Sequence, residues 1–261
     1  MIQLVTCDID GTLLQNGAMT LQPELFDQIR ALKEKGILFC PASGRQYTSL
    51  RWLFEPVADD LVYMCENGGV LYKDGRVIST RPLPRPWAEQ LTRDILAVPG
   101  GEVLISGADM SYVIPKDPAW IDRLRARTHN NIRAVRDVSQ VEEDILKVSV
   151  WYAPGAEKTE ALLAPAWRDK VKVAISGAAW LDFTLADKGT GLEDLCRVLN
   201  IDPACVLSFG DNINDVALLE KVGRPYLMRS THPDLRARFP LQCSRPEEVL
   251  RRLLDEGESA V

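Results

Sequence analysis

The sequence predicts an α/β fold: a doubly wound core with a mostly parallel sheet, interrupted by an inserted α+β domain. Short apolar runs alternate with helical segments over the first 65 residues and again after position 188. Polar clusters follow the apolar runs at their carboxyl ends, where open parallel sheets bind their ligands. The residues between these two parts show paired strands with interspersed helices, which is typical of a separate α+β domain.

The predicted domain boundaries follow from this change of pattern. We expect residues 1–82 and 186–261 to form the core and residues 83–185 to form the inserted domain. Pro82, Pro84 and Pro86 support the first boundary, because closely spaced prolines make a stiff connector.

The elements of the first part are indicated by periodicity and by turn residues. Leu25, Ile29 and Leu32 recur at helical spacing, and Gly36 follows as a helix stop. Asp74-Gly75 lies in the middle of a predicted hairpin. The predicted elements are strands at residues 2–9, 37–40 and 61–65, a helix at 21–35 and the hairpin at 70–79. The order of strand, helix and strand indicates parallel pairing of these three strands.

The later elements complete the two domains. In the inserted domain we expect helices at residues 87–96, 119–128 and 157–167, and strands at 102–106, 111–114, 145–151, 171–176 and 180–185. In the returning core we expect helices at 189–199, 215–222 and 247–255, and strands at 205–209 and 224–228.

Composition indicates an ordinary soluble protein. The formal net charge is -6 and no basic stripe stands out, so we expect no nucleic-acid partner. No apolar stretch approaches the ~18 residues of a membrane span, and we expect a cytoplasmic protein with no membrane partner. Six cysteines show no CxxC spacing, and we expect them to be reduced and mostly buried. The oligomeric state is not predicted.

The strongest chemical motif is Asp8-Ile9-Asp10-Gly11-Thr12, which directly follows the first apolar strand. Two carboxylates at a strand end repel each other unless a proton or a cation lies between them, and Mg²⁺ takes oxygen ligands of this kind. Asp8 is then a candidate nucleophile toward phosphorus, and Asp10 a candidate general acid and base. The alternative is a plain turn, since Asp-Gly is common turn chemistry.

A second acidic cluster, at residues 210–215, ends the strand at 205–209. Asp211 and Asp215 lie four residues apart, and Asn214 adds an amide. Such a cluster is suited to hold the far side of a shared Mg²⁺. The alternative is an Asx-rich cap for the following helix, and both readings can hold together.

Three further polar segments adjoin predicted core strands. Ser43-Gly44-Arg45 offers a hydroxyl and backbone N–H groups for phosphate oxygens, although Ser43 is equally suited to cap a helix. Lys188 is placed to neutralise a phosphate, although a single lysine is more often a solvated surface group. Asn67 lies in the polar segment that follows the strand at 61–65.

Together these segments resemble the haloacid dehalogenase-like superfamily. The order is Asp8-x-Asp10-Gly-Thr, Ser43-Gly-Arg, Lys188-Gly and Gly210-Asp-x-x-Asn-Asp215. The large insertion between the second and third motifs is similar to the Cof-type branch. The resemblance covers nearly the whole chain and implies a Rossmann-like core whose inserted domain is a cap that selects the substrate.

The resemblance also implies roles for single residues. Asp8 matches the nucleophile and a Mg²⁺ ligand. Asp10 matches the general acid and base, and its backbone carbonyl matches a second Mg²⁺ ligand. Asp211 matches the remaining protein ligand of Mg²⁺. The matched phosphate or substrate binders are Gly11, Thr12, Ser43, Gly44, Arg45, Lys188 and Asn214, with Asp215 and Asn67 in support.

Two segments depart from the branch. Arg229-Ser230-Thr231 follows Met228 where a Gly-Asn-Ala stretch is usual, and Arg245-Pro246-Glu247 replaces an Asp-Gly-Val before the last helix. We expect neither segment to touch the proposed chemistry.

The expected activity is Mg²⁺-dependent hydrolysis of a small phosphorylated metabolite, such as a sugar phosphate, through an aspartyl-phosphate on Asp8. The alternatives are phosphomutase-type transfer and, less favoured, non-catalytic binding of such a metabolite. Carbon–halogen hydrolysis is disfavoured because Asp10 and the magnesium ligands would then have no role. The absence of GxxxxGK[ST] argues against a P-loop NTPase.

Overall fold

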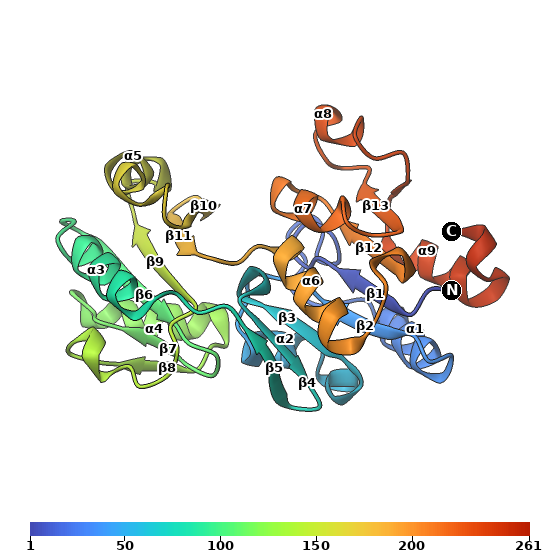
Figure 1. Ribbon diagram of the computed structural model, residues 1–261, viewed down its shortest axis with the longest axis horizontal. Coiled ribbons are helices and arrows are strands. Elements are labelled where there is room, and N and C mark those ends of the chain that lie inside the picture. The colour runs from blue at the N-terminus through green and yellow to red at the C-terminus, as the bar shows by residue number, and fades with distance from the viewer. The chain divides into compact units, whose positions relative to one another are not determined.

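The computed structural model describes the backbone of residues 1–261 and every side chain except that at position 127. The chain forms two compact units (Figure 1). The core unit comprises residues 1–43, 50–79 and 187–261, and the inserted unit comprises residues 44–49 and 80–186.

A five-stranded parallel sheet forms the centre of the core unit, in the order β14-β13-β12-β1-β2. β1 lies between β2 and β12, with Cys7 level with Pro41 on one side and Phe209 on the other. The predicted α/β fold class with a parallel core is therefore confirmed. The strands are β1 Leu4–Cys7, β2 Leu38–Pro41, β12 Val206–Gly210, β13 Arg224–Met228 and β14 Gln242–Cys243.

Helices cover the core sheet in two pairs. α1 (Pro23–Glu34) packs against α9 (Pro246–Glu256), and α6 (Lys188–Leu199) packs against the short α7 (Val216–Leu219). Leu4 belongs to the apolar cluster formed with α6 and α7. Because successive strand residues face opposite sides, Val5 faces the other layer. This two-sided burial explains why β1 is apolar throughout and buried at all four positions.

One predicted strand lies in a different sheet. The sequence analysis placed residues 61–65 in the parallel sheet, but β3 (Val62–Cys65) pairs antiparallel with β4 (Val70–Lys73), which continues to β5 (Arg76–Thr80). Only an isolated parallel bridge, Ala42 to Met64, links β3 to β2.

Pro41 explains the missing ladder. The Ala42 N–H donates to β1, and the Leu38 N–H donates to the residue that precedes β1. Because N–H groups alternate between the two sides of a strand, those of residues 39, 41 and 43 point toward β3. Proline has no N–H to give. The Ser43 N–H is the donor that reaches β3, at 2.9 Å from the Met64 carbonyl oxygen.

The inserted unit is built on a six-stranded sheet in the order β10-β11-β9-β6-β7-β8. Helices α3 (Arg85–Leu96) and α5 (Ala156–Trp167) contribute to the apolar cluster on one face, while Trp120 of α4 (Pro118–Thr128) packs near Trp151 and Trp180 on the other. The strands are β6 Gly101–Ser106, β7 Ser111–Val113, β8 Ile132–Ala134, β9 Lys147–Tyr152, β10 Lys172–Gly177 and β11 Trp180–Thr184.

Several short elements escaped the sequence analysis: α2 (Tyr47–Leu53), β8, α8 (Pro233–Arg236) and β14. These elements are too short for periodicity to identify.

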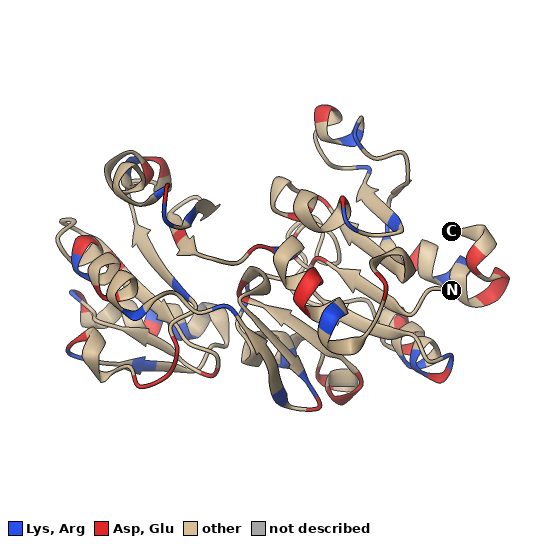
Figure 2. Ribbon diagram, viewed as in Figure 1, with Lys and Arg blue, Asp and Glu red and all other residues tan. Residues whose placement is uncertain are grey.

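Five of the six cysteines are buried, and Cys205 is half-buried. Figure 2 shows lysine and arginine interspersed with acidic residues along both units. Among the described residues, no helix combines the length and the apolar character needed to cross a membrane.

Candidate active site

The candidate site lies where three neighbouring strands of the core sheet end. Asp8 follows β1, Ser43 lies two residues beyond β2, and Asp211 follows β12. The Asp8 N–H donates to the Phe209 carbonyl oxygen at 3.0 Å, which continues the β1–β12 ladder to the first catalytic candidate. Parallel strands thus bring residues about 200 positions apart in the chain to one sheet edge.

Three carboxylates meet at this edge. Asp8, Asp211 and Asp215 each offer an oxygen, and these oxygens all lie within 4.8 Å of one another. Asp8 and Asp215 are buried and Asp211 is partly exposed. A shared Mg²⁺ requires the carboxylates of Asp8 and Asp211 to meet, and the structure brings them together.

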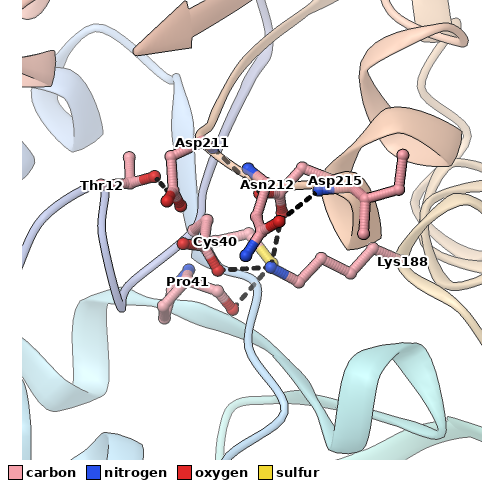
Figure 3. A network of polar contacts seen from close by, with 9 residues as sticks. Thr12, Cys40, Pro41, Lys188, Asp211, Asn212 and Asp215 are labelled. Carbon is pink, nitrogen blue, oxygen red and sulfur yellow. Dashed lines mark hydrogen bonds and ion pairs between the residues drawn. The ribbon is translucent and has the colours of Figure 1, made fainter. Parts of the chain in front are cut away.

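Lys188 lies among these carboxylates. Its ammonium group donates to Asp8 Oδ1. It also donates, at 2.6 Å, to Asp215 Oδ1 (Figure 3). The side chain is only 1% exposed, so the lysine is not the solvated surface group of the alternative reading. It stands at the first position of α6, whose capping box is formed by Asp187 and Thr190.

Asp215 and two threonines fix the loop that carries Asp211. Asp215 Oδ2 accepts the N–H groups of Asp211 and Asn212, both at 3.0 Å. The Thr12 hydroxyl donates to Asp211 Oδ1 at 3.1 Å (Figure 3). Thr231 donates its hydroxyl to the Asp211 carbonyl oxygen at 2.8 Å. Residues 229–231 thus reach the backbone of the Asp211 loop, and the expectation that they do not touch the proposed chemistry stays a prediction.

The electrostatics of the cluster show an excess of negative charge. Burial raises the pKa of Asp8 to about 8; Lys188 opposes this, whereas Asp215 and Asp211 add to it. Burial and then Asp215 also raise the pKa of Asp211. Burial acts to lower the pKa of Lys188, but Asp8 and Asp215 outweigh it and raise that pKa above its ordinary value.

This arrangement fits a small divalent cation. With all three carboxyl groups ionised, the cluster and its one ammonium would carry two negative charges in excess. The donors are hard oxygens, which Mg²⁺ prefers. A dication beside Asp8 and Asp211 would balance the charge and favour the ionised form of both carboxyl groups.

Gly11 allows the two acidic loops to approach each other. Its φ is +101°, a conformation that strains other residues, and an added Cβ would lie 2.2 Å from Asp211 Oδ2. The Asp-Gly pair therefore does more here than make a turn, because a side chain at position 11 would displace a carboxylate of the cluster.

A strained turn positions Lys188 relative to Ser43. Residues 66, 67 and 68 all have positive φ. The Asn67 N–H donates to the Ser43 carbonyl oxygen at 2.9 Å. A Cβ on Gly68 would lie 2.5 Å from the Asp187 carbonyl oxygen and 2.9 Å from Gly191 Cα. The turn thus links the end of β2 to the start of α6. Gly191 allows this close approach, and the sequence alone did not predict that role for it.

The remaining predicted residues differ in burial and in the unit to which they belong. The side chains of Asp10 and Asn214 are exposed. Asn212, rather than Asn214, caps the following turn, by accepting the Ile213 N–H at 2.7 Å. Gly44 and Arg45 belong to the inserted unit, and Ser43 is buried at 3% exposure. The catalytic and binding roles of all these residues stay predictions.

Comparison with known proteins gives consistent matches along the chain. The family model of haloacid dehalogenase-like hydrolases matches residues 5–248. A 5-amino-6-(5-phospho-D-ribitylamino)uracil phosphatase of Escherichia coli is 25% identical over 88% of this chain and 86% of its own. A pyridoxal phosphate phosphatase of the same organism is 22% identical over 90% and 91%. A crystal structure from Eubacterium rectale superposes with a TM-score of 0.85 at 28% identity, covering 97% of this chain and 99% of that one.

We predict that Gly11→Ala weakens Mg²⁺ binding at least about tenfold, because the methyl group displaces the Asp211 carboxylate. Titration calorimetry in phosphate-free buffer measures the affinity. Gly17→Ala is the matched control: Gly17 also has positive φ (+77°), but an added Cβ there meets nothing within 4 Å. Both variants lose stability through backbone strain, and equal Mg²⁺ affinity in the two would contradict the prediction.

We predict that Asp8→Asn stabilises the metal-free protein progressively as the pH rises. The folded carboxyl keeps its proton up to about pH 8, whereas the ordinary value is 3.8. Proton binding by the Asp8 carboxyl therefore stabilises the folded wild type. This contribution is complete below about pH 4 and is lost as the pH rises from about 4 to about 8. The variant has no such group, so its advantage in unfolding free energy should grow by at least about 1 kcal/mol from pH 5 to 8.

Thermal and denaturant unfolding in EDTA measure this difference. Asp59→Asn, whose side chain is 88% exposed, gives the same change of formal charge at the surface. An advantage of Asp8→Asn that stays constant between pH 5 and 8 would show that the buried carboxyl does not hold its proton.

Proposed function

Since the family match spans residues 5–248, the chain belongs to the haloacid dehalogenase-like hydrolases, and we propose that it is a Mg²⁺-dependent phosphatase acting through Asp8. The observation that carries this proposal is the cluster of Asp8, Asp211 and Asp215 around the buried Lys188. The named relatives described above are phosphatases of small phosphorylated metabolites. We extend that substrate class to this protein.

In the first step, an Asp8 carboxylate oxygen attacks the phosphorus of the bound ester. A bond forms between this oxygen and phosphorus, the ester P–O bond breaks, and Asp10 gives a proton to the departing alcohol oxygen. Lys188 already donates to Asp8, so its ammonium group holds the carboxylate and lies ready to stabilise negative charge on the phosphoryl oxygens.

In the second step, water cleaves the aspartyl-phosphate. Asp10, now ionised, takes a proton from the water as its oxygen attacks phosphorus, and the bond to Asp8 breaks. Inorganic phosphate leaves and both carboxyl groups return to their starting state. Ser43 and the neighbouring backbone N–H groups serve as further phosphate contacts in this proposal.

The metal would be held by Asp8, Asp211 and the backbone carbonyl of Asp10. Bound there, Mg²⁺ supplies positive charge that neutralises the transferring phosphoryl group. Asp215 holds the Asp211 loop through two N–H groups and pairs with Lys188, so it supports the metal site indirectly. The inserted unit serves as the cap in this proposal and selects the organic part of the substrate.

Phosphoryl transfer to a second hydroxyl is the alternative, because the first step is shared. The difference lies in the acceptor that takes the phosphoryl group from Asp8. Released inorganic phosphate indicates hydrolysis, whereas an isomerised phosphate ester with little free phosphate indicates a mutase.

We predict that the protein releases phosphate from sugar phosphates only with Mg²⁺, and that Asp8→Asn lowers kcat by at least about 10³-fold because covalent catalysis is lost. A phosphate-release assay over a panel of metabolites, with and without EDTA, measures this. Asp59→Asn, with its exposed side chain, controls for the general effect of the substitution. Wild-type rates in Asp8→Asn would exclude Asp8 as the nucleophile.

We predict that Asp10→Asn slows hydrolysis according to the leaving group. An alkyl phosphate needs a proton on its departing oxygen, so its kcat should fall about 10²- to 10⁴-fold. p-Nitrophenyl phosphate, whose phenolate leaves without a proton, should form the aspartyl-phosphate nearly as fast as in wild type. Single-turnover measurement of p-nitrophenol release separates this step. If the rate of the first step falls by the same factor with both esters, Asp10 does not act as the general acid.

A further inference from the structure

Asp211, a candidate metal ligand, is held from both strands that flank its own. β12, which ends one residue before it, lies between β1 and β13 in the core sheet. Thr12, in the loop after β1, donates its hydroxyl to Asp211 Oδ1 at 3.1 Å (Figure 3). Thr231, three residues beyond β13, donates its hydroxyl to the Asp211 carbonyl oxygen at 2.8 Å. One threonine therefore restrains the carboxylate, and the other restrains the backbone that carries it.

Thr231 is the restraint whose substitution leaves the charge of the cluster unchanged. Asp215 also holds this loop, through the N–H groups of Asp211 and Asn212. Its other carboxylate oxygen pairs with Lys188, so a substitution there would alter the electrostatics as well as the position of Asp211. Thr231 is uncharged, and it lies outside the motifs from which the site was predicted. Its substitution therefore separates the effect of loop position from that of charge.

The turn that carries Thr231 is anchored in the sheet. The Thr231 N–H donates to the Met228 carbonyl oxygen at 3.1 Å. The Arg229 N–H donates to the Cys243 carbonyl oxygen at 2.9 Å. Met228 of β13 is level with Cys243 of β14, and both side chains are buried. The Thr231 hydroxyl is therefore presented by a fixed turn, and a fixed donor can orient the ligand loop to which it is bonded.

Restraint of a ligand matters because divalent cations differ in the geometry that they accept. Mg²⁺ needs near-octahedral coordination by oxygens at about 2.0–2.1 Å, whereas Ca²⁺ accepts about 6–8 oxygens at about 2.3–2.6 Å in a flexible arrangement. Asp211 is partly exposed, so packing alone does not fix its carboxylate. A loop held at its side chain, its N–H and its carbonyl suits the cation with the stricter geometry. A loosened loop would lose more affinity for Mg²⁺ than for Ca²⁺.

We propose that Thr231 is a positioning residue that fixes the Asp211 loop and thereby increases the preference of the site for Mg²⁺ over Ca²⁺. It acts through the backbone of Asp211 and needs no contact with the metal or the substrate. Alanine, which is usual at this place in the Cof-type branch, has no hydroxyl to donate, so Thr231 adds a restraint that the usual residue does not supply. The inference rests on the proposed function, because the metal is the one that Asp8 and Asp211 would hold in the phosphatase.

Thr231→Val tests the inference, because it removes the hydroxyl with little change of volume. Titration calorimetry with Mg²⁺ alone and with Ca²⁺ alone, in phosphate-free buffer, measures both affinities. The Kd for Mg²⁺ should rise about 3- to 10-fold, the size expected for one lost hydrogen bond, and the Kd for Ca²⁺ should change less than about 2-fold. Thr231→Ser keeps the hydroxyl and should keep the wild-type ratio of the two constants.

Thr92→Val is the matched control. The Thr92 hydroxyl donates to the Ala88 carbonyl oxygen at 2.8 Å, within α3 of the inserted unit, so the same substitution removes a bond of the same kind and length. It should leave the ratio of the Mg²⁺ and Ca²⁺ constants unchanged even if it lowers the melting temperature. A general loss of stability is thereby separated from a loosened metal-ligand loop.

Amide hydrogen exchange in EDTA gives a readout that needs neither metal nor turnover. The N–H groups of Asp211 and Asn212, which donate to Asp215, should exchange faster in Thr231→Val than in wild type or Thr231→Ser. Wild-type exchange at residues 211–215, an unchanged Mg²⁺ affinity, or an equal loss of affinity for both cations would each overturn the inference. So would a wild type that binds Mg²⁺ no more tightly than Ca²⁺. A protein with the expected cation preference and no phosphatase activity would instead overturn only the proposed function.

Discussion

The contact between Lys188 and two buried carboxylates is the interaction on which the site depends. Asp8 and Asp215 come from different loops, and the ammonium group donates to both. Removing Lys188 would leave buried carboxylates without a counter-charge, which typically costs about 3–5 kcal/mol, whereas removing Asp8 would reduce the excess of negative charge. The ammonium group of Lys188 does not balance all the nearby carboxylates, because Asp211 adds a third one within 4.8 Å. The fold thus holds a charge excess that a dication can balance, at some expense of stability in its absence.

Backbone geometry, more than side-chain packing, brings these charges together. β1 and β12 pair in parallel and place Asp8 and Asp211 at one edge. Gly11 then admits the Asp211 carboxylate to a distance that any Cβ would prevent. On the other side, the left-handed turn at residues 66–68 lies against the start of α6. Strain concentrated in such turns is typical of sites whose geometry must be fixed before substrate binds.

The sequence was sufficient to predict the fold class and the meeting of Asp8 with Asp211, because apolar strands and the polar residues after them are local signals. It was insufficient where a non-local partner decides the outcome. Residues 61–65 read as a core strand, but Pro41 removes the donor that would have joined them to β2. Thr231 binds the Asp211 loop from 20 residues away, and no spacing rule indicates that contact. The functional roles, including those of Asp10 and Asn214, are set by a bound substrate and remain predictions.

The two faces of the inserted sheet differ in how much apolar surface they bury. Apolar residues of β6, β9 and β11 gather on the face that α3 and α5 cover, and this cluster is large enough to hold the unit together. The opposite face carries a smaller apolar cluster around Trp120, and its remaining positions on β6, β9 and β11 are polar. There Lys147 pairs with Asp182, and the buried Ser106 hydroxyl has no hydrogen-bond partner among the described residues; such groups are poor stabilisers. Lys147 and Ser106 are level in the sheet, whereas Asp182 is level with Ser149, and apolar residues of similar size would stabilise this sheet at least as well.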